Sequence, residues 1–170
     1  MRVLFWIIWF QMAFGLFAQV KIKLDAKLTD ADRLGEKLNV AWVKLLEDNQ
    51  PKDSVLTQSG RAFFSLDTGR VYRVIFYRNS YATKFLYIDT RNVPKNYNPK
   101  TIKIEVALFR EKEGLDVEFL KTQPMGIAAY DDISKKIDWN RDYSRMITEK
   151  IIQATLEYAR KKKEETKEPD

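Results

Sequence analysis

Apolar and polar residues alternate almost without interruption between residues 61 and 94, in the stretch RAFFSLDTGRVYRVIFYRNSYATKFLYIDTRNVP. A period of two places successive side chains on opposite faces of an extended strand, so this stretch predicts several half-buried strands. The short steps DTG and NS interrupt the alternation and are typical of turns. Such a chain folds by packing the apolar face of one sheet against another layer.

The same alternation continues on both sides of this stretch, with a predicted loop at 48–53 around Pro51. It indicates seven strands joined by short turns, with no helices alternating between them. This order favours a seven-stranded, antiparallel, immunoglobulin-like β-sandwich over residues 19–110 and argues against a doubly wound α/β fold. The seven predicted strands are 20–28, 38–47, 54–58, 61–66, 71–78, 81–90 and 101–109.

The pattern changes after residue 110. Residues 111–139 form an extension with isolated apolar residues and one candidate edge strand, MGIAAY. From 140 to 165 the apolar residues recur at helical spacing, which predicts a helix packed on the outside of the sandwich. A polar tail follows at 166–170. The apolar stripe of this helix consists of Tyr143, Ile147, Ile151, Ala154 and Tyr158.

The first residues predict a secretory signal peptide over 1–18, because Arg2 precedes a long apolar run and Ala18 precedes the polar Gln19. The alternative is an uncleaved membrane anchor. The run is interrupted at Gln11, however, and is shorter than the about 20 residues that a bilayer span needs. We therefore expect an exported protein, periplasmic or extracellular, with no stable membrane span after cleavage.

The sequence contains no histidine and no cysteine. This excludes Ser-His-Asp and Cys-His arrangements, the usual zinc sites and any disulfide scaffold. Acid and base chemistry would fall to groups such as carboxylates. Four candidate carboxylates lie at predicted strand ends or turns, where solvated surface is the simpler interpretation: Asp25, Glu47, Asp67 and Asp89. We expect no catalytic residue and no cofactor.

The charge is mildly basic, with 30 Lys and Arg against 24 Asp and Glu, and loss of Arg2 with the signal leaves a net charge of +5. The basic residues are dispersed, and the densest run, RKKKEETKE, turns acidic within a few residues. Nucleic-acid binding typically uses a basic face with aromatic platforms, so a nucleic-acid partner is not expected.

One constellation has the spacing of a calcium loop: Asp138, Asn140, Asp142, Ser144 and Glu149 occupy its positions 1, 3, 5, 7 and 12. Position 6 is Tyr143, where the sharp turn of such a loop requires glycine. The competing interpretation is that Asn140 or Asp142 caps the predicted helix.

Aromatic residues form the other candidate site. They are so dense on the predicted strands that they cannot all face the core, and an outward row could contact sugar rings or another protein. The alternative is that the C-terminal helix covers this row. The residues predicted to form a ligand or partner surface are Phe64, Tyr72, Tyr77, Tyr81 and Tyr87.

The stretches GEKLNVAWVKLLE and SVLTQSGRAFFSLDTGRVYRVIFYRNSYATKFLYIDT resemble the carboxypeptidase regulatory-like, or transthyretin-like, β-sandwich domain. FLYIDTRNVP and YDDISKKIDWNRDYS further resemble a group of exported proteins from Gram-negative envelopes. The chain departs from the pattern at Ser80, where a glycine is usual, and at Lys37 and Asn39 in place of proline and glycine. Matching positions are Leu38, Ala41, Val43, Thr57, Gly60, Phe63, Tyr72 and Tyr81.

The resemblance implies a non-catalytic accessory or adhesive module. Together with the composition, it predicts an exported binding or structural module that presents loops or a sheet edge to an envelope or cell-surface protein. The alternative is a carbohydrate-binding module that holds a glycan with outward aromatics. A hydrolase is the third hypothesis, and it requires two carboxylates about 5 to 10 Å apart in a pocket.

Overall fold

The computed structural model describes residues 20–33 and 36–165, so the predicted signal peptide and the tail at 166–170 lie outside the described residues. Nine strands and two helices follow one another along the described chain. In order, they are β1 (Lys21–Asp30), β2 (Ala41–Glu47), β3 (Gln50–Thr57), β4 (Arg61–Asp67), β5 (Val71–Tyr77), β6 (Lys84–Asp89), β7 (Ile102–Leu108), α1 (Phe119–Thr122), β8 (Ile127–Asp131), β9 (Lys136–Trp139) and α2 (Arg141–Glu165).

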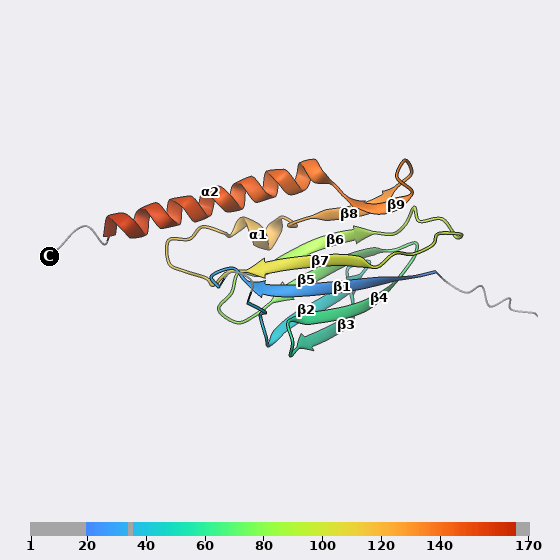
Figure 1. Cartoon of the computed structure of the whole chain (residues 1–170), viewed down its shortest axis with the longest axis horizontal. Coiled ribbons are helices and arrows are strands. Elements are labelled where there is room, and N and C mark those ends of the chain that lie inside the picture. Colours follow the sequence, from blue (N-terminus) through green and yellow to red (C-terminus); the bar gives the residue numbers. More distant parts are fainter. Residues whose placement is uncertain (1–19, 34–35, 166–170) are drawn as a thin grey trace, which may run out of the picture.

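Two sheets of unequal width pack face to face (Figure 1). The narrow sheet has the strand order β4-β1-β7, and the wide sheet has the order β3-β2-β5-β6-β8-β9. The predicted β-sandwich with a C-terminal helix is therefore confirmed in kind, with nine strands in place of seven. It is not wholly antiparallel, because β1 pairs with β7, and β6 with β8, in parallel. Parallel neighbouring strands need a crossover connection. The two strands beyond the predicted seven, β8 and β9, lie in the extension at 111–139, after the last predicted strand.

The predicted loop at 48–53 is wrong. Asp48 and Asn49 have φ angles of 49° and 66° and form a tight hairpin turn, which lets β3 begin at Gln50. Positive φ at both residues of a two-residue turn matches the right-handed twist of the two antiparallel strands that the turn joins. Pro51 is tolerated in β3 because β3 is an edge strand.

The core lies between the two sheets and follows the alternation of the strands. The inward residues of β1 (Ile22, Leu24, Ala26 and Leu28) are almost completely buried. They face inward residues of the wide sheet such as Tyr72 and Phe76, which are also fully buried. Ser80 keeps the left-handed conformation expected of the glycine it replaces, with a φ of 64°, so the connection from β5 to β6 is preserved.

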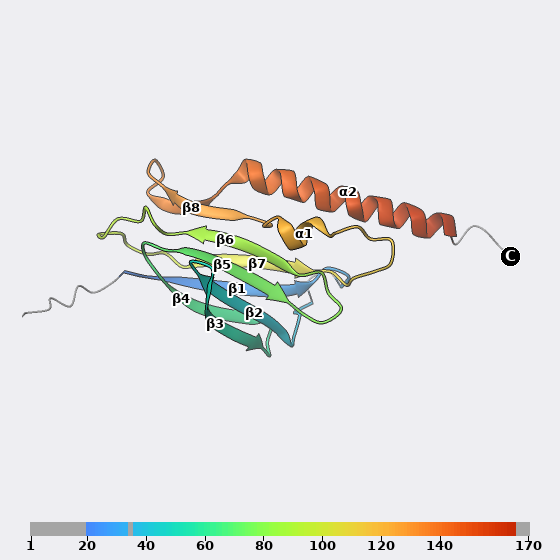
Figure 2. The same cartoon turned by 180° about the vertical axis from the view of Figure 1, so that it is seen from behind.

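Helix α2 begins where the carboxamide oxygen of Asn140 accepts a hydrogen bond from the backbone N–H of Tyr143, at 3.0 Å. This is the N-cap that the sequence offered as the competitor to calcium. The helix packs through Ile147 on a second, smaller cluster that includes Phe109 and Leu120. Figure 2 shows α2 running beside α1 and away from β3 and β4. The expectation that this helix covers the predicted aromatic row is therefore wrong.

No helix in the described part of the chain combines the length and apolarity that crossing a membrane requires.

Lys84 is a buried cation inside the sandwich. Its ammonium donates to the backbone oxygen of Ala107 at 2.5 Å and lies 4.2 Å from the centre of the Phe109 ring. Burial lowers the pKa of Lys84 to about 8, because the charged form loses its hydration. The Lys84 amine thus loses its proton at a lower pH in the folded state than in the unfolded state. The free energy of unfolding therefore rises as pH increases from about 8 toward 10.5.

We expect Lys84→Met to raise the free energy of unfolding by about 1–3 kcal/mol at pH 7, since it removes the cost of a buried charge but also one hydrogen bond. This advantage should shrink by about 2 kcal/mol between pH 7 and 9.5, because over this range the wild-type amine loses its proton in the folded state while it stays charged in the unfolded state. Urea unfolding at several pH values measures it. Lys44→Met, at an exposed position of β2, is the control and should change stability little at any pH. An advantage that is independent of pH would contradict the burial argument.

Candidate functional site: an exposed aromatic patch and its surroundings

The four predicted candidate carboxylates all form ion pairs with Lys or Arg side chains. The pairs are Asp25 with Arg61 at 2.9 Å, Glu47 with Lys52 at 3.0 Å, Asp67 with Lys21, and Asp89 with Arg91 at 2.6 Å. The bond from Arg91 holds the pKa of Asp89 below its usual range. All four carboxylates are held by cationic side chains, which indicates a structural role.

Tyr72 connects the carboxylate of Glu47 with the backbone of Asp67 inside the protein. Its hydroxyl donates to Glu47 at 3.1 Å and accepts the backbone N–H of Asp67 at 2.8 Å. Burial raises the pKa of Tyr72 well above its usual value, so the phenol stays protonated. The bonds fasten the end of β4 to β2 and β5, and Tyr72 therefore has a structural position and no access to a ligand.

The structure separates the five predicted surface aromatics. Phe64, Tyr72 and Tyr81 are buried, so the expectation that they form a binding surface is corrected. Tyr87 is half-buried, and its ring meets that of Phe85 edge to face at 5.7 Å. Tyr77 alone of the five is exposed.

Tyr81 is held in a polar cluster at the end of the sandwich. Its hydroxyl donates to the buried carboxylate of Asp30 at 2.9 Å and accepts from Arg110 at 3.1 Å. The guanidinium of Arg78 lies over its ring at 4.9 Å. The Tyr81 hydroxyl thus joins the connection from β5 to β6 with the end of β1 and with Arg110, which follows β7.

Tyr77 belongs to an apolar row that crosses three neighbouring strands on the outer face of the wide sheet. Trp42 on β2 is in register with Leu56 on β3 and with Tyr77 on β5. Trp42 and Tyr77 are each 39% exposed, Leu56 is 42% exposed, and Val40, just before β2, is 60% exposed. We call these four residues the outer patch.

Sequence reasoning missed three members of the outer patch. The alternation of β2 placed Val40 and Trp42 on one face, but it did not tell which face is outward. The signal that could have found the row is the turn at Asp48–Asn49, because a two-residue turn sets the register between β2 and β3.

Val40 adopts a conformation that is unusual for its residue type. Its φ is 58°, in the left-handed region, which a β-branched side chain rarely enters. Its backbone N–H donates to the oxygen of Thr57 at 2.9 Å, which holds the residue there. A strained and largely exposed valine beside Trp42 contributes little to folding, and strain of this kind is typical of functional surfaces.

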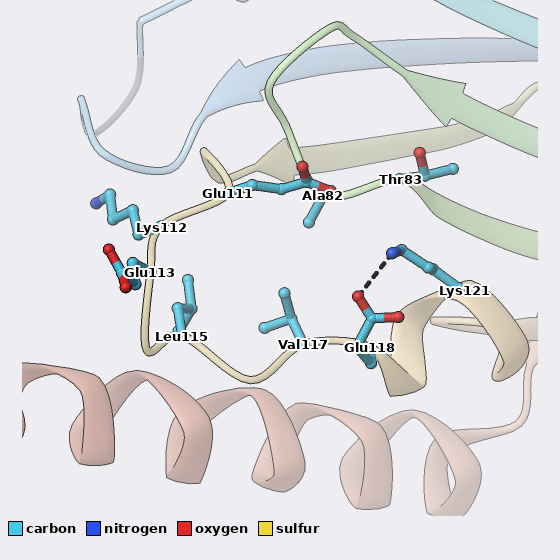
Figure 3. Close-up of a pocket in the computed structure, with 9 residues that line it drawn as sticks. All are labelled: Ala82, Thr83, Glu111, Lys112, Glu113, Leu115, Val117, Glu118 and Lys121. Carbon is cyan, nitrogen blue, oxygen red and sulfur yellow. Dashed lines mark hydrogen bonds and ion pairs between the residues drawn. The ribbon is translucent and has the colours of Figure 1, made fainter.

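A small polar pocket of about 360 Å³ lies between the segment that follows β7 and residues 82–83 (Figure 3). Glu118 at its rim accepts a bond from Lys121 at 2.6 Å, which raises the pKa of Lys121. Its charged lining residues are exposed or half-buried, so the pocket holds no buried polar group to orient a ligand. The charged lining residues are Glu111, Lys112, Glu113, Glu118 and Lys121.

The residues with calcium-loop spacing do not form a loop. Asp138 lies on β9 and pairs with Lys136 at 3.1 Å, Asn140 caps α2, and Asp142 pairs with Arg145 at 2.8 Å. Ser144 and Glu149 lie on α2 itself, so the oxygen atoms are spread along a helix instead of around one point. Within residues 20–33 and 36–165, no group of three or more acidic side chains is close enough to hold a metal ion.

Val40→Asn should raise the free energy of unfolding by about 1 kcal/mol, because asparagine tolerates the positive φ of this position better than valine. Urea unfolding of the variant against the wild type measures this. Leu56→Asn is the matched control, since it also replaces an exposed apolar residue of the outer patch but lies in a regular strand, and it should bring no gain. Equal effects of the two substitutions would contradict the strain at Val40.

No family model matches the chain, and a search of curated proteins finds no match in sequence. Among solved structures, the chain is similar to the Bacillus anthracis TIE protein, with 20% identity and a TM-score of 0.44, over 54% of this chain and 17% of that one. It is also similar to the full-length major pilin SpaD from Corynebacterium diphtheriae, with 10% identity and a TM-score of 0.40, over 55% and 31%. Each match spans less than a third of the other protein.

Proposed function

We propose that this protein is an exported, non-catalytic binding or structural module of the cell envelope, and that the outer patch docks a partner protein. The observation that carries the proposal is the exposed row of Leu56, Trp42 and Tyr77 in register on three strands. Large aromatic residues exposed together on a rigid sheet are the kind of residue that supplies most of the binding energy in protein interfaces.

Two further observations support this proposal. Val40 keeps an exposed apolar side chain at the cost of backbone strain, next to Trp42. The four candidate carboxylates are engaged in ion pairs, which fits a module without acid and base chemistry. Export rests on the apolar segment at 1–18, which lies outside the described residues.

A carbohydrate ligand is the second candidate function, and the exposure of Trp42 and Tyr77 favours it. An aromatic ring on an open sheet face can lie flat against the apolar face of a sugar ring. Under both candidates the same two rings carry the binding, so they are the residues to change first.

The mature chain should capture a defined protein from its own envelope extract, and the double variant Trp42→Ser, Tyr77→Ser should capture it at least tenfold less, because central aromatics dominate interface energies. Quantitative mass spectrometry of the captured fraction measures this. The control is Phe63→Ser, which removes an aromatic residue that is 63% exposed on the narrow sheet. Retention of glycans in place of protein favours the second candidate, and equal capture by both variants overturns the role of the outer patch.

A further inference from the structure

Strand β7 is an edge of the narrow sheet, and the wide sheet continues past it as β8 and β9 (Figure 1). The inward residues of this overhang are apolar: Trp139 and Ile137 on β9 and Tyr130 on β8 pack, half-buried, against the main core. The narrow sheet thus leaves part of the inner face of the wide sheet uncovered, and one more strand beside β7 would cover it.

The backbone of β7 offers hydrogen-bonding groups toward this overhang. The oxygen of Leu108 accepts the N–H of Ala31, on the β1 side. The oxygen of Ala107 accepts from Lys84, and that of Phe109 from the N–H of Ala82, both on the opposite side. Since successive residues of a strand point their N–H and C=O groups to opposite edges, the backbone groups of residues 103 and 105 also point to the open edge.

A groove of about 230 Å³ runs along this open edge. Leu86, Met125 and Trp139 line it on the side of the wide sheet, and residues 103–106 line it on the side of β7. Trp139 lies directly on Gly126, where an added Cβ would come within 3.1 Å of the indole ring. The groove therefore combines an apolar floor with a strand edge that no strand of the described residues pairs with.

The other sheet edges are protected. The wide sheet ends in β3, which carries Pro51, and in β9, which has four residues. On the narrow sheet β4 lies against β3. Proline, shortness and cover are among the devices by which proteins block edge pairing. Strand β7 has seven residues, no proline and an unbroken register with β1.

We propose that β7 binds an extended segment of the partner protein as a fourth strand of the narrow sheet. This inference rests on the proposed function and names a second contact for the same partner. Main-chain bonds to residues 103 and 105 give affinity, and alternate apolar side chains of the segment enter the groove. Its outward side chains meet Lys103 and Glu105, and Glu105 also pairs with Lys27 at 3.1 Å.

A single strand fits this place better than a second copy of the chain. Two copies joined through β7 by a twofold axis would form one continuous narrow sheet. Each copy would then bring its own β8 and β9, spaced at about 4.8 Å per strand, into the space under the other copy. The overhang leaves room for an extended segment but not for a second overhang.

The first test uses the mature chain and the capped peptide Thr-Val-Lys-Val-Glu-Val-Thr, which places opposite charges against Lys103 and Glu105 in an antiparallel arrangement. Amide hydrogen exchange is followed by NMR. In the free protein the amides of Lys103 and Glu105 should exchange faster than those of Ile104 and Val106, which bond to β1. At a peptide concentration of ten times Kd, exchange at Lys103 and Glu105 should slow by about tenfold, with Ile104 and Val106 unchanged.

Two control peptides sharpen the result. Thr-Val-Glu-Val-Lys-Val-Thr matches the same charges only in a parallel arrangement, so the stronger of the two peptides reports the direction of the added strand. Thr-Val-Pro-Val-Glu-Val-Thr lacks the N–H that would donate to the backbone oxygen of Glu105 in the antiparallel arrangement, so it should give no protection at Glu105. Protection by either charged peptide supports the proposal. Absence of protection by both, or equal protection by the proline peptide, overturns it.

A matched pair of variants then tests the edge itself. Glu105→Pro removes the N–H that faces the groove and leaves the bonds to β1 intact, so it should abolish peptide protection at Lys103, while Glu105→Gln should retain it. Capture of the envelope partner is measured in parallel. If Glu105→Pro loses peptide binding but still captures the envelope partner, the edge alone is overturned as a contact of that partner. If Glu105→Pro loses capture while the double variant Trp42→Ser, Tyr77→Ser retains it, the outer patch alone is overturned. The peptide experiment on the unaltered chain decides the matter if Glu105→Pro does not fold.

Discussion

Burial of one face of each sheet is the constraint on which the rest of this structure depends. The chain has no cysteine, so burial and hydrogen bonding alone hold the two layers together. Each buried Å² of apolar surface contributes roughly 25 cal/mol, and the inward residues of β1, β5 and β6 are almost completely withdrawn from water. Buried tyrosine hydroxyls in this interior have partners, as Tyr72 has in Glu47 and Tyr81 in Asp30.

The unequal width of the two sheets creates the unusual features at one side of the molecule. Three strands cannot cover six, so β8 and β9 require other partners. The chain meets this need in part with Met125 and Tyr97, which pack against the core from connecting segments. Helix α2 does not complete the cover, because it closes its own cluster around Ile147 and α1. The apolar groove beside β7 is what remains.

The outer patch and the β7 edge are separate surfaces with different physical bases. The outer patch consists of side chains that the sheet register brings together, and its rings are exposed because the helix lies elsewhere. The β7 edge consists of backbone groups that the narrow sheet leaves unpaired. A partner that uses both would gain specificity from the first and an ordered strand from the second.

The sequence by itself determined the local features: the alternation of the strands, the helix over 140–165 and its cap at Asn140 or Asp142. These depend on neighbouring residues alone. Tyr72 and Tyr77 have opposite parity, so only one can be outward, but parity does not tell which. The tertiary structure decided that Tyr77 is outward, that β8 joins β6 in parallel and that β7 keeps an open edge, because strand pairing unites residues far apart in the chain.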